Sequence, residues 1–98
     1  MRGSDKFEIF RKALAEYITI LAKSAAETNW AEDRKAYEIH LADAALMFAA
    51  IENDRSIVKL KQLIAAERHG YGWGYLRGSF GNSAESAFNT FAKLVEMG

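Results

Sequence analysis

The chain has 98 residues, half of them hydrophobic, with 13 basic and 13 acidic side chains and a formal net charge of zero. This length and apolar content predict one globular helical domain over residues 1–98 instead of a disordered segment. The balanced charge gives no electrostatic case for binding nucleic acid or an anionic membrane. The absence of cysteine excludes disulfides, thiolate metal sites and thiol catalysis.

The start of the chain bears on its location. Residues 1–4 lead straight into a charged amphipathic segment and not into the apolar core of a signal peptide. No stretch approaches the uninterrupted apolar length of a membrane span. We therefore expect a cytoplasmic protein that contacts no membrane, in which residues 1–4 are either a disordered start or a vector remnant.

The helical content follows from residue type and spacing. Proline is absent, and alanine, leucine, glutamate and lysine favour helix almost throughout. Apolar residues recur three and four positions apart, which places them on one face of each helix. We predict an all-α fold, an antiparallel (up-down) four-helix bundle, with helices at residues 5–27, 29–52, 54–79 and 83–97.

Polar residues at the junctions predict where the helices begin. The first helix is expected to start near Ser4 or Asp5, and Asn29 is expected to cap the second. Asn53 or Asp54 is expected to cap the third. Asn82, with a glutamate three residues later, resembles a capping box at the start of the last helix.

The expected core consists of the large apolar residues on these faces. Its members are Phe10, Leu14, Tyr17, Leu21, Tyr37, Leu41, Phe48, Ile57, Leu60, Ile64, Phe88 and Phe91. On the second helix the predicted buried stripe is Trp30, Tyr37, Leu41, Ala44, Phe48 and Ile51.

The second helix also has apolar residues opposite its main stripe. Ile39 and Leu46 lie there, and Ile9 and Ile20 look exposed on the first helix. A helix that is apolar on most of its circumference is covered on more than one side. Either it is the central helix of the domain or its back face meets a second subunit, and we expect a homodimer.

Residues 70–81, GYGWGYLRGSFG, form a glycine–aromatic segment. It is either a loop or a continuation of the third helix, extended or kinked, and helix is slightly favoured. Exposed aromatic and arginine side chains are typical anchors for a partner. The expected partner-binding residues are Trp73 and Arg77, with Tyr71, Tyr75 and Phe80 beside them. In the competing interpretation the glycines merely admit a neighbouring helix and Trp73 fills a gap.

These features favour a non-enzymatic protein-interaction module of the adaptor, inhibitor, immunity-protein or antitoxin type, whose protein partner the sequence does not identify. The alternative is a small-ligand-binding or enzymatic bundle with a pocket around Glu67, His69 and His40. Glu67 is more simply explained by a hydrogen bond to Tyr71 or an ion pair with Arg77.

Metal binding has little support in the sequence. His40 and Asp43 are three residues apart and could share a metal ion or a proton, but two ligands do not make a site. The chain has no Glu-x-x-His unit of the kind found in di-iron bundles. We expect no metal and no cofactor, and we interpret His40 as a hydrogen-bonded residue at the edge of the core.

Arg34 and His40, with five residues between them, resemble the Arg-x4–6-His element of HEPN-type ribonucleases. Members of that family are small helical proteins that act as dimers. The resemblance implies that Arg34 and His40 would polarise a phosphate and assist attack by the ribose hydroxyl. It covers seven residues, and Lys35 stands where the motif usually has a polar residue.

Overall fold

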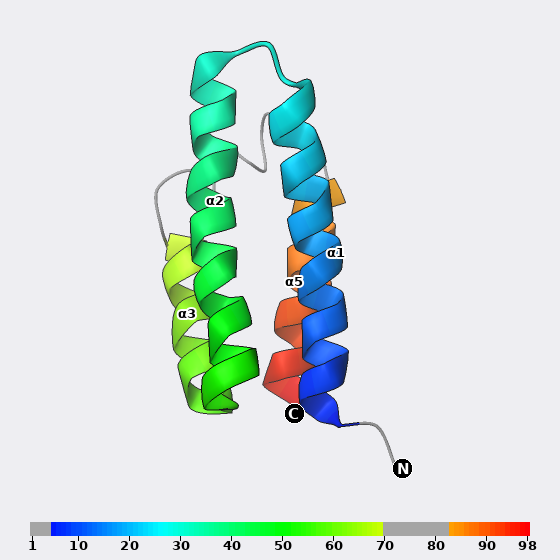
Figure 1. Ribbon diagram of the computed structural model, residues 1–98. Helices are drawn as coiled ribbons and strands as arrows, with labels where there is room; N and C mark the ends of the chain where they lie inside the picture. The colour runs from blue at the N-terminus through cyan, green and yellow to red at the C-terminus, as the bar shows by residue number, and fades with distance from the viewer. Residues whose placement is uncertain (1–4, 70–82) are drawn as a thin grey trace.

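The computed structural model describes residues 5–69 and 83–98, and all regular secondary structure in these ranges is helical. The elements, in chain order, are α1 (Lys6–Glu27), α2 (Ala31–Ala49), the π-helical turn η1 (Ala50–Asp54), α3 (Ile57–His69) and α5 (Ser83–Met97) (Figure 1). For the described residues, the prediction of an all-α fold is confirmed.

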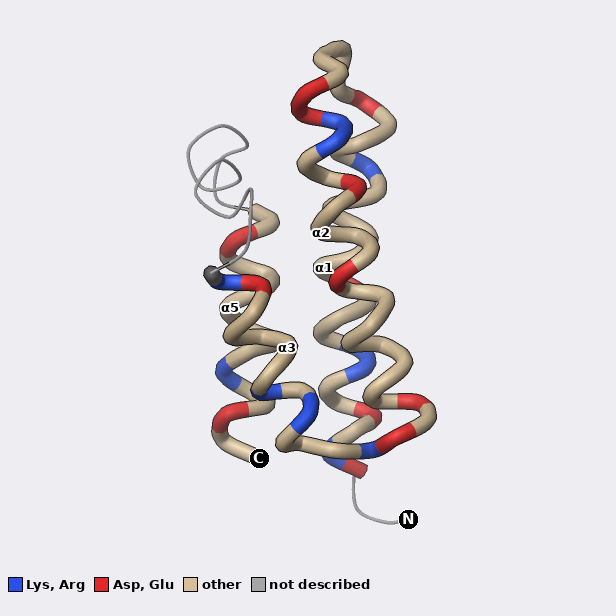
Figure 2. The backbone as a smooth tube through the Cα atoms, turned by 90° about the vertical axis from the view of Figure 1, so that its left-hand side faces the viewer, with Lys and Arg blue, Asp and Glu red and all other residues tan. Residues whose placement is uncertain are grey.

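The helices contact one another in a ring. α1 packs against α2 and α5, and α3 packs against the same two helices. Figure 1 shows α1 and α2 side by side, joined by residues 28–30, with α3 and α5 alongside their lower halves. Figure 2 gives the same arrangement from the side, and acidic and basic residues are interspersed along the tube. In the part of the chain that the structure describes, no helix is both long and apolar enough to cross a membrane.

The starts of α1 and α2 differ in how they are capped. The Asp5 carboxylate accepts a hydrogen bond from the backbone N–H of Phe7 at 2.9 Å, so Asp5 is the N-cap of α1, one of the two residues near which the sequence predicts the start of this helix. The N-cap position of α2 is occupied by Trp30, which makes no side-chain cap bond. The prediction that Asn29 caps this helix was therefore wrong.

The junction between α2 and α3 is a wider turn followed by a left-handed residue. Arg55 has φ 46° and ends η1, and its backbone N–H bonds to the carbonyl of Ala50 at 2.7 Å. Ser56 Oγ then accepts from the backbone N–H of Lys59 at 3.1 Å. Ser56, and neither Asn53 nor Asp54, thus caps α3. η1 keeps residues 50–54 in helical geometry, so Asn53 and Asp54 lie inside a helical turn and the cap of α3 falls to Ser56, after Arg55.

Two further predictions concern the ends of the described ranges. The third helix reaches His69, the last residue described before the gap. Its continuation to residue 79 and the cap at Asn82 lie outside the described residues and stay predictions. The last helix spans Ser83–Met97, the bounds predicted from the sequence.

The core lies between the four helices and is built mainly from the predicted residues. The large, fully buried apolar side chains are Leu14, Tyr17, Leu21, Met47, Ile51, Leu60, Phe88, Phe91 and Val95. Three predicted core residues, Leu41, Phe48 and Ile57, are only partly buried at its edge. Trp30, expected on the buried stripe, is 72% exposed.

The corrections at Leu41 and Phe48 share one cause, the rotation of α2. Its buried residues are Ala36, Tyr37, His40, Ala44 and Met47. Relative to the predicted stripe, the buried face of α2 is rotated about the helix axis by roughly 50°, half of the 100° between consecutive residues. This rotation places the side chains of His40 and Met47 in the core and those of Leu41 and Phe48 at the edge of the core. When a helix has apolar residues on most sides, its own sequence does not determine which side faces the core. A polar partner on another helix can determine it.

Candidate functional site

Four ionisable side chains from three helices meet inside the bundle. Tyr17 comes from α1, where it lies on the core stripe between Leu14 and Leu21. His40 and Asp43 come from α2, and their spacing of three residues puts them on one face. Glu67 comes from α3. We call these four residues the buried polar cluster.

Glu67 is the centre of the buried polar cluster. Its Oε2 accepts a hydrogen bond from the Tyr17 hydroxyl at 2.9 Å and lies 2.7 Å from Nδ1 of His40. His40 is 0% and Glu67 1% exposed. Because a carboxylate oxygen only accepts, Nδ1 carries the proton of the second bond. The other oxygen, Oε1, is buried and has no hydrogen-bond partner among the described residues.

Asp43 connects the cluster to the surface, since its side chain is only partly buried. His40, Asp43 and Glu67 each have one atom that could ligate a metal ion, a ring nitrogen or a carboxylate oxygen, and these three atoms all lie within 4.8 Å of one another. Burial raises the pKa of Asp43 to about 6, and the neighbouring Glu67 carboxylate adds to this. Two carboxyl groups this close disfavour a second negative charge unless a proton or a cation lies between them.

The pKa values of Glu67 and Tyr17 are also shifted by their surroundings in the cluster. Burial alone would raise the pKa of Glu67, but the hydrogen bond from His40, the close contact with the Asp43 carboxyl and the hydrogen bond from Tyr17 outweigh it and lower the pKa below its usual value. The pKa of the Tyr17 hydroxyl is raised, first by burial and then by the charge of Glu67. Glu67 therefore loses its proton at a lower pH than Asp43 does, and Tyr17 remains a neutral donor.

The structure brings together two of the three residues of the predicted pocket. His40 and Glu67 are in contact, but both are closed off from solvent. His69 lies at the end of α3, and its side chain is outside the described part. His40 was predicted to be a hydrogen-bonded residue at the edge of the core. The hydrogen bond is confirmed, but His40 lies inside the core and not at its edge.

Other predicted site residues fall in the gap between residues 69 and 83. The expected contact residues Trp73, Arg77, Tyr71, Tyr75 and Phe80 lie outside the described residues, so the partner surface stays a prediction.

The sequence analysis missed the polar role of Tyr17, which it placed in the core for its apolar ring. A buried tyrosine usually needs a partner for its hydroxyl. Because Tyr17 was expected in the core, this requirement could have predicted a polar side chain on a facing helix.

The arrangement of Arg34 and His40 corrects the expectation from the HEPN resemblance. Six residues along a helix turn the second side chain about 120° from the first. Arg34 is exposed, and its guanidinium donates to the carbonyl of Thr28 at 2.9 Å. His40 is fully buried and bonded to Glu67, so the two side chains do not share a surface on which RNA could bind.

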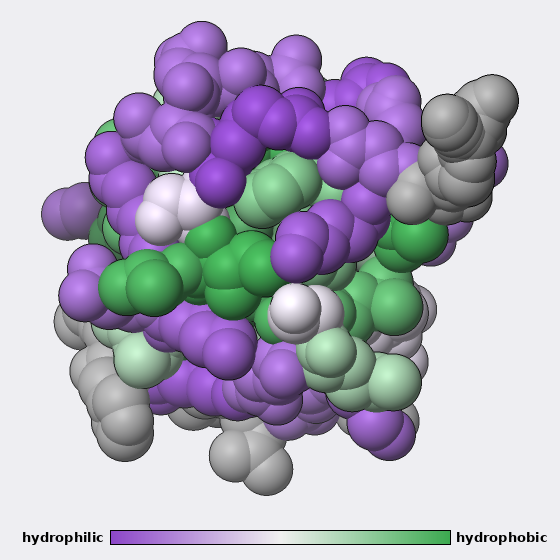
Figure 3. Space-filling view, turned by 90° about the horizontal axis from the view of Figure 1, so that it is seen from below, coloured by the Kyte–Doolittle hydropathy of each residue, from purple (hydrophilic) through white to green (hydrophobic). Residues whose placement is uncertain are grey.

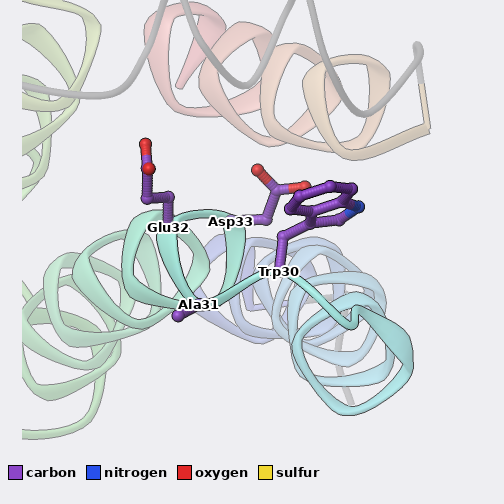
Figure 4. A pocket seen from close by; sticks show the side chains of 4 residues that line it. All are labelled: Trp30, Ala31, Glu32 and Asp33. Atoms are coloured by element: carbon purple, nitrogen blue, oxygen red, sulfur yellow. The ribbon is translucent and has the colours of Figure 1, made fainter.

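The surface hollows lie away from the buried polar cluster. One is a shallow hollow at the start of α2, lined by Trp30, Ala31, Glu32 and Asp33 (Figure 4). Figure 4 shows the Asp33 carboxylate beside the Trp30 ring, while Glu32 points away from it. The two acidic side chains make this hollow unsuited to an anion, although it lies at a helix N-terminus.

Several large apolar side chains are exposed. They are Ile9 (42%), Trp30 (72%), Leu46 (57%), Val58 (68%) and Met97 (77%). Seen from the end of the molecule where α1 begins and α5 ends, a hydrophobic band crosses a largely hydrophilic surface (Figure 3). Ile20, which looked exposed in the sequence, is partly buried against the core.

Comparisons of the chain with protein-family models, with curated proteins and with solved structures find no match.

Proposed function

We propose that this chain is a non-enzymatic protein-interaction module that associates first with a second copy of itself, through the outward face of α2. The observation that carries the proposal is the exposure of Leu46 opposite the buried face that contains Ala44 and Met47. Had Leu46 been covered within one chain, the apolar back of α2 would need no partner.

The residues around Leu46 have the spacing of a helix-pairing seam. Ile39, Ala42, Leu46 and Ala49 follow one another at intervals of three, four and three residues. This is the a/d pattern by which one helix packs along another. Ala42, Leu46 and Ala49 are exposed and Ile39 is partly buried. We call these four residues the α2 seam.

The α2 seam is complementary to itself in an antiparallel pair. A two-fold axis at the level of Ala44 places Leu46 opposite the partner's Ala42, and Ile39 opposite the partner's Ala49. Each large side chain then faces a small one, which lets the two backbones approach closely. The same axis brings exposed Lys35 beside the partner's exposed Glu52, a pair of opposite charges. These features favour a second copy of this chain as the occupant.

The proposal includes the finer features expected from the sequence. The four helices form an antiparallel bundle that acts as a rigid scaffold in the cytoplasm. The glycine–aromatic segment, residues 70–81, supplies a second contact surface with Trp73 and Arg77 as its anchors. A module of this kind belongs to the adaptor, inhibitor, immunity-protein or antitoxin class. The closed position of His40 and Glu67 supports a binding role over a catalytic one.

Leu46→Glu tests the dimer. In an antiparallel pair the new carboxylate faces an alanine of the partner in an apolar seam, so burying it is costly. We expect the wild-type chain to be a dimer at tens of micromolar and the variant to dissociate at least about tenfold more readily, which corresponds to about 1.4 kcal/mol. Sedimentation equilibrium measures both constants.

Val58→Glu is the matched control, because Val58 is exposed (68%, against 57% for Leu46) but lies on α3, outside the α2 seam. It should leave the dissociation constant unchanged. A wild-type chain that sediments only as a monomer would contradict the proposal, as would equal effects of the two substitutions.

A further inference from the structure

We propose that the buried polar cluster binds a divalent transition-metal ion, with His40, Asp43 and Glu67 as its protein ligands. This site is independent of the α2 seam and of the proposed interaction function. His40 and Asp43 come from α2 and Glu67 comes from α3. A metal ligand needs a ring nitrogen without a proton, so an ion bound at Nδ1 of His40 displaces the proton that Nδ1 now donates to Glu67, and that proton is released to solvent.

The donor set fits such an ion. One imidazole nitrogen and two carboxylates match the nitrogen and oxygen ligands of Zn²⁺, Fe²⁺ and Co²⁺ sites. Metal–ligand bonds of about 2.0–2.2 Å place the donors of one ion about 3–4 Å apart. The three donors here lie within 4.8 Å of one another.

A second observation points to the same site. Oε1 of Glu67 is buried with no hydrogen-bond partner among the described residues, although Oε2 of the same carboxylate is fully engaged. An unsatisfied, buried carboxylate oxygen is costly, and a cation satisfies it directly. The Tyr17 hydroxyl then has the role of an outer partner that holds the carboxylate in place.

The charge balance supports a cation as well. Two carboxyl groups lie inside the helix interface, and burial of uncompensated negative charge is unfavourable. A divalent ion compensates both and removes the need for a proton shared between Asp43 and Glu67. Asp43, being only partly buried, gives the ion a path from solvent. Three protein ligands leave at least one position for water.

Metal binding at this place would fasten α2 to α3. The unfolded chain does not hold the three ligands together, so an ion that binds the folded state raises the melting temperature. The test uses the full chain freed of metal by a chelator that is then removed. Co²⁺ is added first, because its visible absorption reports the ligand geometry, and Zn²⁺ is then titrated calorimetrically.

We expect one ion per chain, a visible Co²⁺ spectrum and a higher melting temperature. Asp43→Asn should lower the affinity at least about tenfold, and since Asp43 is partly exposed this variant should still fold. Glu38→Gln, an exposed carboxylate on the same helix, and His69→Gln, the other histidine, are the controls and should bind as the wild type does.

Three results would overturn the proposal. One is the absence of one-per-chain binding in the folded wild-type protein. Another is unchanged affinity in Asp43→Asn, and the third is loss of binding in His69→Gln. Each of them would leave the cluster as a hydrogen-bonded, proton-sharing network. None of them bears on the oligomeric state, so failure here is distinguishable from failure of the proposed function.

Discussion

Replacing Phe91 with alanine is expected to lower the free energy of unfolding by about 3–5 kcal/mol. Phe91 is 0% exposed, and its ring lies 6.3 Å, centroid to centroid, from that of Phe88. Removing it deletes buried apolar surface and leaves a cavity between helices whose positions are fixed by other contacts. A loss of this size is a large part of the stability of a small domain, which is about 5–15 kcal/mol. Urea unfolding followed by circular dichroism measures it.

Phe48→Ala is the matched control for this prediction. Phe48 belongs to the same residue type but lies partly buried at the edge of the core, because α2 is rotated. Its loss should be clearly smaller, since neighbouring water already contacts part of the ring. Equal losses at the two positions would show that the rotation of α2 is wrong.

Replacing Glu67 with alanine in the metal-free protein should cost a similar amount, about 3–5 kcal/mol. The substitution removes the acceptor of two buried donors, the Tyr17 hydroxyl and Nδ1–H of His40. Each donor then pays for its lost hydration without a hydrogen bond in return. Because Tyr17 is on α1 and His40 on α2, the contacts among three helices weaken together. Urea unfolding in the presence of a chelator measures the loss.

Two gentler substitutions serve as controls. Glu67→Gln keeps an oxygen acceptor in place and should cost less than Glu67→Ala. Tyr17→Phe removes one hydrogen bond and keeps the ring in the core, so about 1 kcal/mol is expected. If Glu67→Ala were as stable as the wild type, Glu67 would not be the centre of the cluster.

The helices and most of the core were predictable because they depend on local pattern. In α1 and α5 most of the large apolar residues lie on one stripe, so the buried face is defined by the sequence of the helix itself. The bounds of α5 and the N-cap Asp5 follow from the same local chemistry. Nothing outside these segments is needed to predict them.

α2 shows where local pattern stops being sufficient. With Ile39 and Leu46 on one side and Leu41 and Phe48 on another, several rotations bury similar apolar area. In the observed one, His40 contacts Glu67, which is 27 residues away in the chain. Such long-range pairs cannot be read from spacing within one helix. The buried polar cluster was therefore found only in part, through the spacing of His40 and Asp43.

Disulfide trapping across the α2 seam tests the central claim most directly. The native chain has no cysteine, so Ala42→Cys and Leu46→Cys each introduce the one thiol of their chain. In the antiparallel pair, residue 42 of one copy faces residue 46 of the other. A mixture of the two variants under mild oxidation should therefore cross-link faster than either variant alone, and Val58→Cys should give only the background rate. Cross-linking no faster than that background in the mixture would contradict pairing of two copies through α2, and faster cross-linking of each variant with itself would contradict the antiparallel arrangement.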